Sequence, residues 1–84
     1  MHELGLANNI LDIVRQYVPA ERACAVRSVR VRVGDLAGVV PDSLAFCFSA
    51  IVIDTPYDRA SLAIDHVVGP DLQVADIELE EETP

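Results

Sequence analysis

The sequence predicts an α+β fold in which two helices cover one face of a three-stranded sheet, in the order α-β-α-β-β. Three observations support this fold class: a helical apolar stripe near the start, a strict alternation of valines in the middle, and a turn signal between two short apolar runs near the end. The 84 residues suit one domain, and the 51% of apolar residues suffices for a core. We therefore expect residues 1–84 to form a single domain.

The first element is an amphipathic helix of three to four turns that ends before Pro19. The residue that precedes a proline is disfavoured in helical conformation, so Pro19 supplies the stop. Glu3, near the start, suits the positive end of the helix dipole. Apolar residues recur at the three- and four-residue spacing of a buried helix face, namely Leu4, Ala7, Leu11, Val14 and Val18.

A strand with one buried face follows, because Val29, Val31 and Val33 alternate with polar residues. Gly34 and Gly38 bracket the next turn, where we expect both to allow positive φ. The run that begins at residues 41–43, Pro-Asp-Ser, is typical of a helix start. This second helix is expected to extend to about Asp54, before the Thr-Pro pair at residues 55–56.

Two further strands are predicted over residues 61–67 and 72–80. A Gly-Pro-Asp turn signal separates them, so we expect a tight connection and antiparallel strands. The apolar phase of the last strand slips between Val74 and Ile77. This slip predicts a β-bulge near Ala75 and Asp76.

The charge balance excludes some partner classes. The formal net charge is −8, and all six cationic side chains are arginines. Phosphate-rich partners repel such a chain, so we expect no general binding to nucleic acid or to an anionic membrane. No apolar run reaches the roughly 18–20 residues needed to cross a bilayer, and no signal-peptide pattern opens the chain. A cytoplasmic location is the resulting expectation.

The first three residues, Met1, His2 and Glu3, form a candidate metal site. The amine of Met1 and the amide of His2 can close a five-membered chelate ring, and the same amide with His2 Nδ1 closes a six-membered ring. Ni(II) and Cu(II) favour such square-planar nitrogen coordination. The donors must lose protons to bind, so affinity should fall in acid. On this chemistry alone, an accidental histidine near the start of the chain is an open alternative.

The chain opens Met-His-Glu-Leu-Gly-Leu-Ala, and residues 34–44 read Gly-Asp-Leu-Ala-Gly-Val-Val-Pro-Asp-Ser-Leu. These two segments resemble the HypA/HybF family of hydrogenase nickel-incorporation proteins. Both runs are specific to that family, and the Thr-Pro pair at residues 55–56 also falls where the family has one. The similarity covers residues 1 to about 67 and resumes over residues 72–80.

The resemblance implies a non-enzymatic role as a nickel metallochaperone. Members bind Ni(II) through the N-terminal histidine, here His2, with nearby backbone nitrogens, and Glu3 occupies the position that helps to shape the site. They pass nickel to a partner GTPase and on to the large subunit of [NiFe] hydrogenase, or in some bacteria to urease. The residues themselves show no catalytic nucleophile, paired carboxylates or cofactor loop, which also argues against an enzyme.

One departure from the family pattern concerns zinc. The family carries a zinc-binding insert with two CxxC pairs between its last two strands, whereas this chain has a short turn at residues 68–71. Its two cysteines, Cys24 and Cys47, form no CxxC pair, so we expect free, buried thiols and no zinc site, with a disulfide between the two as the alternative. A natural variant and a deliberate deletion both fit. The alternative function is an interaction or assembly module that keeps the fold without delivering metal.

Two further candidate surfaces remain. His66, at the end of the second strand, could complete a nickel site, and the alternative is a surface imidazole. The second helix is apolar nearly all round. We therefore expect a partner or homodimer surface on it, with deeper burial within the monomer as the alternative. The residues assigned to that surface are Phe46, Phe48, Ile51 and Ile53.

Overall fold

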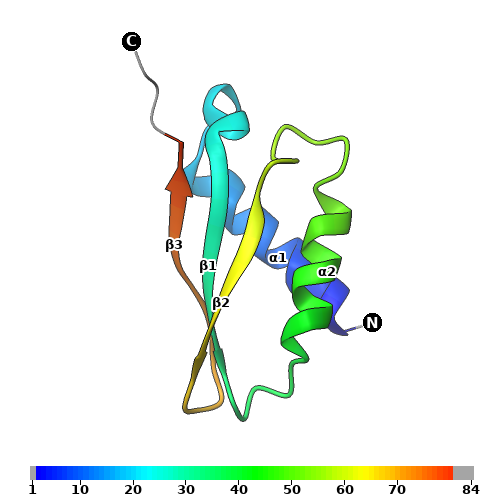
Figure 1. Ribbon diagram of the computed structural model, residues 1–84, viewed down its shortest axis with the longest axis vertical. Helices are drawn as coiled ribbons and strands as arrows, with labels where there is room; N and C mark the ends of the chain where they lie inside the picture. The colour runs from blue at the N-terminus through cyan, green and yellow to red at the C-terminus, as the bar shows by residue number, and fades with distance from the viewer. Residues whose placement is uncertain (1, 81–84) are drawn as a thin grey trace.

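The computed structural model describes residues 2–80 and confirms the α+β fold class and the element order. The two α-helices lie beside a three-stranded sheet (Figure 1). A short 3-10 helix, η1, lies between the first helix and the first strand, where the sequence pattern predicts no regular element. The elements are α1 (His2–Tyr17), η1 (Ala20–Ala25), β1 (Val26–Gly34), α2 (Pro41–Ile51), β2 (Ser61–Val67) and β3 (Leu72–Leu79).

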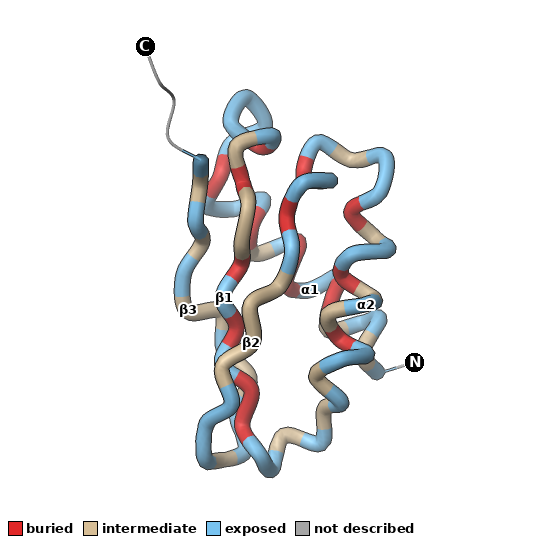
Figure 2. The backbone as a smooth tube through the Cα atoms, in the orientation of Figure 1, coloured by how far each residue is buried: buried red, intermediate tan, exposed pale blue. Residues whose placement is uncertain are grey.

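The sheet order is β2-β1-β3, with β1 in the centre. β1 pairs with β2 in parallel and with β3 antiparallel, so β2 and β3 run in opposite directions as expected. They are not neighbours, however, and the implied hairpin pairing between them is wrong. β1 takes the central place because its inward valines are fully buried, whereas the strands on both sides are only half-buried along the same face (Figure 2).

The connection from β2 to β3 crosses the end of β1. The backbone N–H groups of Gly34, Asp35 and Leu36 donate, at 2.8–2.9 Å, to two carbonyl oxygens of the connection and to that of the last residue of β2. A Cβ atom on Gly34 would lie 2.1 Å from the Gly69 oxygen. Gly34 is therefore required for close backbone approach and not for positive φ, which corrects the expectation; positive φ is found at Gly38.

The predicted bulge in β3 is confirmed. Arg30 of β1 is paired with Asp76, but the next residue, Val31, is paired with Val74, so Ala75 is the extra residue. The bulge lets two apolar side chains that are three residues apart face the same side of the sheet. This explains the slip in the apolar phase.

The core lies between the sheet and the two helices, which pack against each other on one face of it (Figure 1). The opposite face of the sheet is polar: Arg30 lies between the carboxylates of Asp65 and Asp76, at 3.2 and 3.4 Å. Buried residues come from every element except β2 and β3: Ala7, Ile10, Leu11, Val14, Val18, Ala23, Val26, Val29, Val31, Val33, Leu44, Phe48, Val52, Tyr57 and Ala60.

Helix α2 is shorter than expected, because it ends at Ile51 instead of continuing to about Asp54. Asp54 has a φ of 64°, which a right-handed helix does not allow. The Thr55 hydroxyl donates to the Val52 carbonyl at 2.7 Å and closes the turn that follows. Both cysteines are free, as expected, but Cys24 is exposed rather than buried because it lies in η1 at the surface.

Neither α1 nor α2 could cross a membrane: over residues 2–80, every helix is too short or too polar to do so.

Candidate metal-binding N-terminus

His2 is the first residue of α1, and its side chain is 61% exposed to solvent. Met1, the other predicted donor of a nitrogen, lies outside the described residues. The backbone N–H groups in the first turn of a helix have no acceptor within that helix. The amides of His2 and Glu3 are therefore not committed to helical hydrogen bonds, and the imidazole of His2 is accessible beside them.

Glu3 reaches from α1 to the start of α2. Its Oε2 accepts a hydrogen bond from the Val40 N–H at 3.2 Å and lies 3.7 Å from His2 Nδ1. The Val40 N–H, followed by the N–H of Glu3 itself and by His2, lowers the pKa of the Glu3 carboxyl. The carboxylate thus faces both the proposed metal-binding imidazole and the second helix.

This link between the helices was not predicted from the sequence. Val40 is the N-cap of α2 and makes no side-chain capping hydrogen bond, since valine has no acceptor. The N–H of the N-cap residue is one of the donors at a helix start that have no acceptor within the helix. Glu3, on the other helix, supplies an acceptor for this N–H of Val40.

A shallow hollow of about 390 Å³ separates the starts of the two helices. Glu3 forms one side, and the first turns of α2 form the other with Asp42, Ser43, Phe46 and Cys47. The exposed Phe46 and the half-buried Cys47 thus line the same hollow as Glu3, near the start of α1.

Side chains alone do not build a metal centre in the described part of the chain. Over residues 2–80, no three His, Cys, Asp or Glu side chains come together in a way that could hold a metal ion. His66, the possible additional ligand, is exposed at the end of β2 and forms no such cluster with His2 and Glu3. A metal at His2 would therefore rely on backbone nitrogens.

The four residues assigned to a partner surface separate into exposed and buried ones. Phe46 and Ile53 are 74% and 64% exposed, and Ile51 is half-buried. Phe48 is fully buried, so its assignment to a surface is wrong. Two residues along a helix differ by about 200° in direction, and Phe46 and Phe48 consequently face opposite sides of α2.

Together, the fold and this site define a small α+β domain that presents a histidine and uncommitted first-turn amides at the start of its first helix. A family model described as "Hydrogenase/urease nickel incorporation, metallochaperone, hypA" matches residues 1–78. The chain belongs to the HypA family, as the two motifs indicated. Four residues, 68–71, join β2 to β3, and a form of the family without the zinc domain fits a chain this short.

Relatives named "Hydrogenase maturation factor HypA" support the assignment. The protein from Streptomyces avermitilis is 47% identical over 70 residues, which cover 82% of this chain and 53% of the relative. The protein from Desulfatibacillum aliphaticivorans is 43% identical over 68 residues, covering 80% and 52%. The protein from Rhizobium leguminosarum bv. viciae is 39% identical over 69 residues, covering 82% and 61%. The chain thus spans only a little over half the length of these relatives.

Proposed function

We propose that this chain binds Ni(II) at Met1, His2 and Glu3 and acts as a non-enzymatic metallochaperone or accessory protein in [NiFe] hydrogenase maturation. The observation that carries the proposal is the exposed His2 imidazole beside first-turn amides that have no acceptor within the helix, in a chain of the HypA family. Nickel is the cargo, and it would be held by His2 Nδ1 with backbone nitrogens of the first three residues. Square-planar nitrogen coordination suits Ni(II).

Glu3 supports this site without needing to be a side-chain ligand. Its hydrogen bond from Val40 ties the first turn of α1 to α2 and restricts the residues that carry the donor nitrogens. When nickel binds, His2 Nδ1 turns from the Glu3 carboxylate to the metal. The carboxylate keeps its negative charge close to the cation, which favours binding.

The proposed mechanism of delivery is ligand exchange in the cytoplasm. A site at the exposed start of a helix leaves room for incoming ligands from a partner. We propose that the first partner is a maturation GTPase and that the hydrogenase large subunit receives the nickel next. No zinc is required for this step, and we propose that the chain binds none.

Nickel titration by calorimetry tests the proposal, using a sample whose first residue is verified as Met1. Wild type should bind one Ni(II), and His2→Ala should bind roughly tenfold or more weakly because a ligand is lost. An extension before Met1 should weaken binding similarly, since it replaces the free amine. His66→Ala is the matched control and should leave the affinity unchanged. Equal affinity in all four samples would refute the nickel site.

An interaction module that does not deliver metal is the second candidate. The exposed Phe46 and Ile53 favour it, because apolar side chains this exposed are typical of contact surfaces when they cluster. We propose a homodimer or partner contact through this side of α2. A monomeric mass by light scattering at high micromolar concentration, with no change on Phe46→Ser, would contradict the homodimer.

A further inference from the structure

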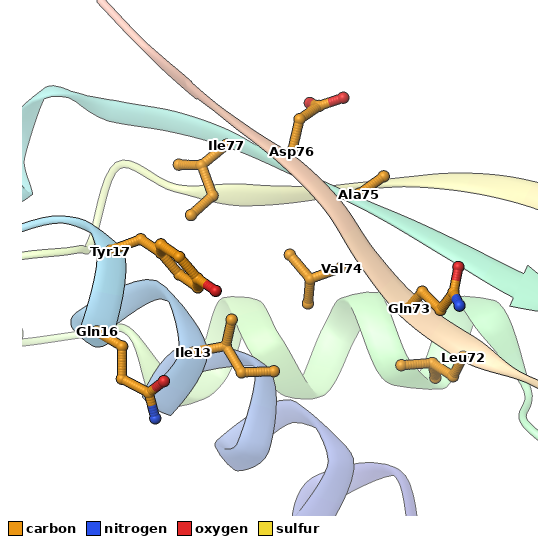
Figure 3. Close-up of a pocket in the computed structure, with 9 residues that line it drawn as sticks. All are labelled: Ile13, Gln16, Tyr17, Leu72, Gln73, Val74, Ala75, Asp76 and Ile77. Carbon is orange, nitrogen blue, oxygen red and sulfur yellow. The ribbon is translucent and has the colours of Figure 1, made fainter.

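A groove of about 750 Å³ with a mixed apolar and polar lining lies between the last two turns of α1 and strand β3. Figure 3 shows Ile13 and Tyr17 of α1 and Val74 and Ile77 of β3 pointing toward the same space. The three aliphatic side chains are only half-buried, and Tyr17 is 75% exposed. The helices therefore leave the β3 side of the sheet incompletely covered.

The groove runs along a free edge of the sheet. Among residues 2–80, β3 pairs with β1 on one side only, so its other side presents backbone N–H and C=O groups that have no partner strand in this part of the chain. Such an edge can accept an additional strand from another chain. An added strand would place alternate side chains into the groove and onto the open face of the sheet.

The charges beside the groove select the chemistry of that strand. Residues 72–80 include Asp76, Glu78 and Glu80 and no cationic residue. Figure 3 shows Asp76 pointing away from the groove, toward the open face. An added strand would therefore meet apolar side chains on one face and carboxylates on the other.

β1, the strand that already pairs with β3, has apolar residues on one face and basic residues on the other. In β1, valines face the core while Arg30 and Arg27 pair with Asp76 and Glu80 across the open face. β1 thus shows which alternation complements β3 in this structure: apolar residues inward and basic residues outward.

We propose that the groove between α1 and β3 receives an extended segment of a partner protein in which apolar and basic residues alternate, added as a fourth strand on the free edge of β3. The bulge at Ala75 interrupts regular pairing, so the segment pairs mainly along residues 76–79. A second copy of this chain is a poor occupant. Both edge strands carry carboxylates, Asp65 on β2 and Asp76 with Glu78 on β3, and neither carries Lys or Arg.

Fluorescence anisotropy with labelled ten-residue peptides tests the proposal on the whole chain. One peptide alternates valine and arginine, a second has the same composition in two blocks, and a third alternates valine and glutamate. The alternating basic peptide should bind best. Glu78→Lys and Tyr17→Ala, both at exposed positions, should each weaken it about tenfold, since one reverses a charge and the other removes a wall of the groove. Asp58→Lys makes the same charge change away from the groove and should have no effect.

Hydrogen exchange and NMR shift mapping locate the peptide. Binding should protect amides of residues 76–79 and shift the resonances of Ile13 and Tyr17. If the alternating and block peptides bind with equal affinity, binding depends only on general charge attraction, and the proposal is overturned. Shifts confined to α2, or a dimer of this chain joined through β3 edges, would overturn it as well. Circular dichroism of both variants verifies that they are folded.

Discussion

Replacing Gly34 by alanine tests how closely the β2–β3 connection approaches β1. The new Cβ would lie 2.1 Å from the Gly69 oxygen, 2.7 Å from its carbonyl carbon and 2.9 Å from the Asp71 oxygen. All three are backbone atoms, so no side chain can rotate away. Restoring a normal separation of about 3.5 Å to the Gly69 oxygen requires a shift of roughly 1.4 Å.

Such a shift breaks the hydrogen bonds that hold the connection. Gly34, Asp35 and Leu36 donate to Asp71, Val67 and Gly69 at 2.8, 2.8 and 2.9 Å. Each bond contributes about 0.5–1.5 kcal/mol, and retained overlap would cost about 1–3 kcal/mol instead. We therefore expect Gly34→Ala to lower the free energy of unfolding by about 2–4 kcal/mol. At about 4–8 °C per kcal/mol for a domain of this size, Tm falls by about 10–30 °C.

Two other glycines are matched controls in the same urea and thermal unfolding assay. Gly5 lies inside α1 with open space around its Cβ position, so Gly5→Ala should stabilise the chain by about 0.5–1 kcal/mol. Gly38 also has open space but a φ of +71°, so Gly38→Ala should cost about 1 kcal/mol. The reasoning fails if Gly34→Ala is no more destabilising than Gly38→Ala.

Three further outcomes are expected. Tyr57→Phe removes the donor to the buried Val18 carbonyl, a bond of 3.0 Å, and should cost about 1–2 kcal/mol in urea unfolding; no loss would show that water replaces the hydroxyl. Arg30→Gln should cost at most about 1 kcal/mol in low salt and less in high salt, because its ion pairs are exposed. The hydrogen bond from Val40 lowers the pKa of Glu3, so the carboxylate stabilises the fold fully above its ordinary pKa of 4.5 and loses this contribution as pH falls through the folded pKa. Glu3→Gln should consequently unfold with a weaker dependence on pH in acid, and an unchanged pH profile would contradict the assignment.

The local elements were predictable from the sequence because their signals are local. The spacing of Leu4, Ala7 and Leu11 and the stop at Pro19 defined α1, and the alternating valines defined β1. The slip between Val74 and Ile77 predicted a bulge near Ala75 and Asp76, and the extra residue is Ala75. Each of these signals depends only on neighbours within one helix turn or one strand.

The strand order was missed although the sequence contains a signal for it. The segment between β1 and β2 includes α2, and a strand-helix-strand connection of this length joins parallel neighbours. β2 therefore lies beside β1, and β3 takes the other side. Four residues suffice to cross two strand spacings of about 4.8 Å each, since four extended residues reach about 13 Å. A short turn was thus not evidence for a hairpin.

The assignment of Phe48 to a surface was also wrong because a signal present in the sequence was not used. Apolar residues on α2 were counted without their helical phase, although Leu44, Phe48 and Val52 recur every four residues and mark the buried face. Phe46 lies on the opposite side. The contact between Glu3 and Val40 was not predictable in this way, because it depends on how α1 and α2 pack across 37 residues of sequence.

The two proposed surfaces lie at opposite ends of α1. Glu3 and Phe46 line the same hollow, so a protein that contacts Phe46 is placed beside the proposed nickel site. Ile13 and Tyr17 line the groove, and the 15 residue steps from His2 to Tyr17 correspond to about 22 Å along the helix. A strand held at β3 therefore leaves His2 accessible. Because the groove and the proposed nickel site lie at opposite ends of α1, the two proposed contacts need not compete, and one partner can be held at the sheet edge while another reaches the proposed nickel site.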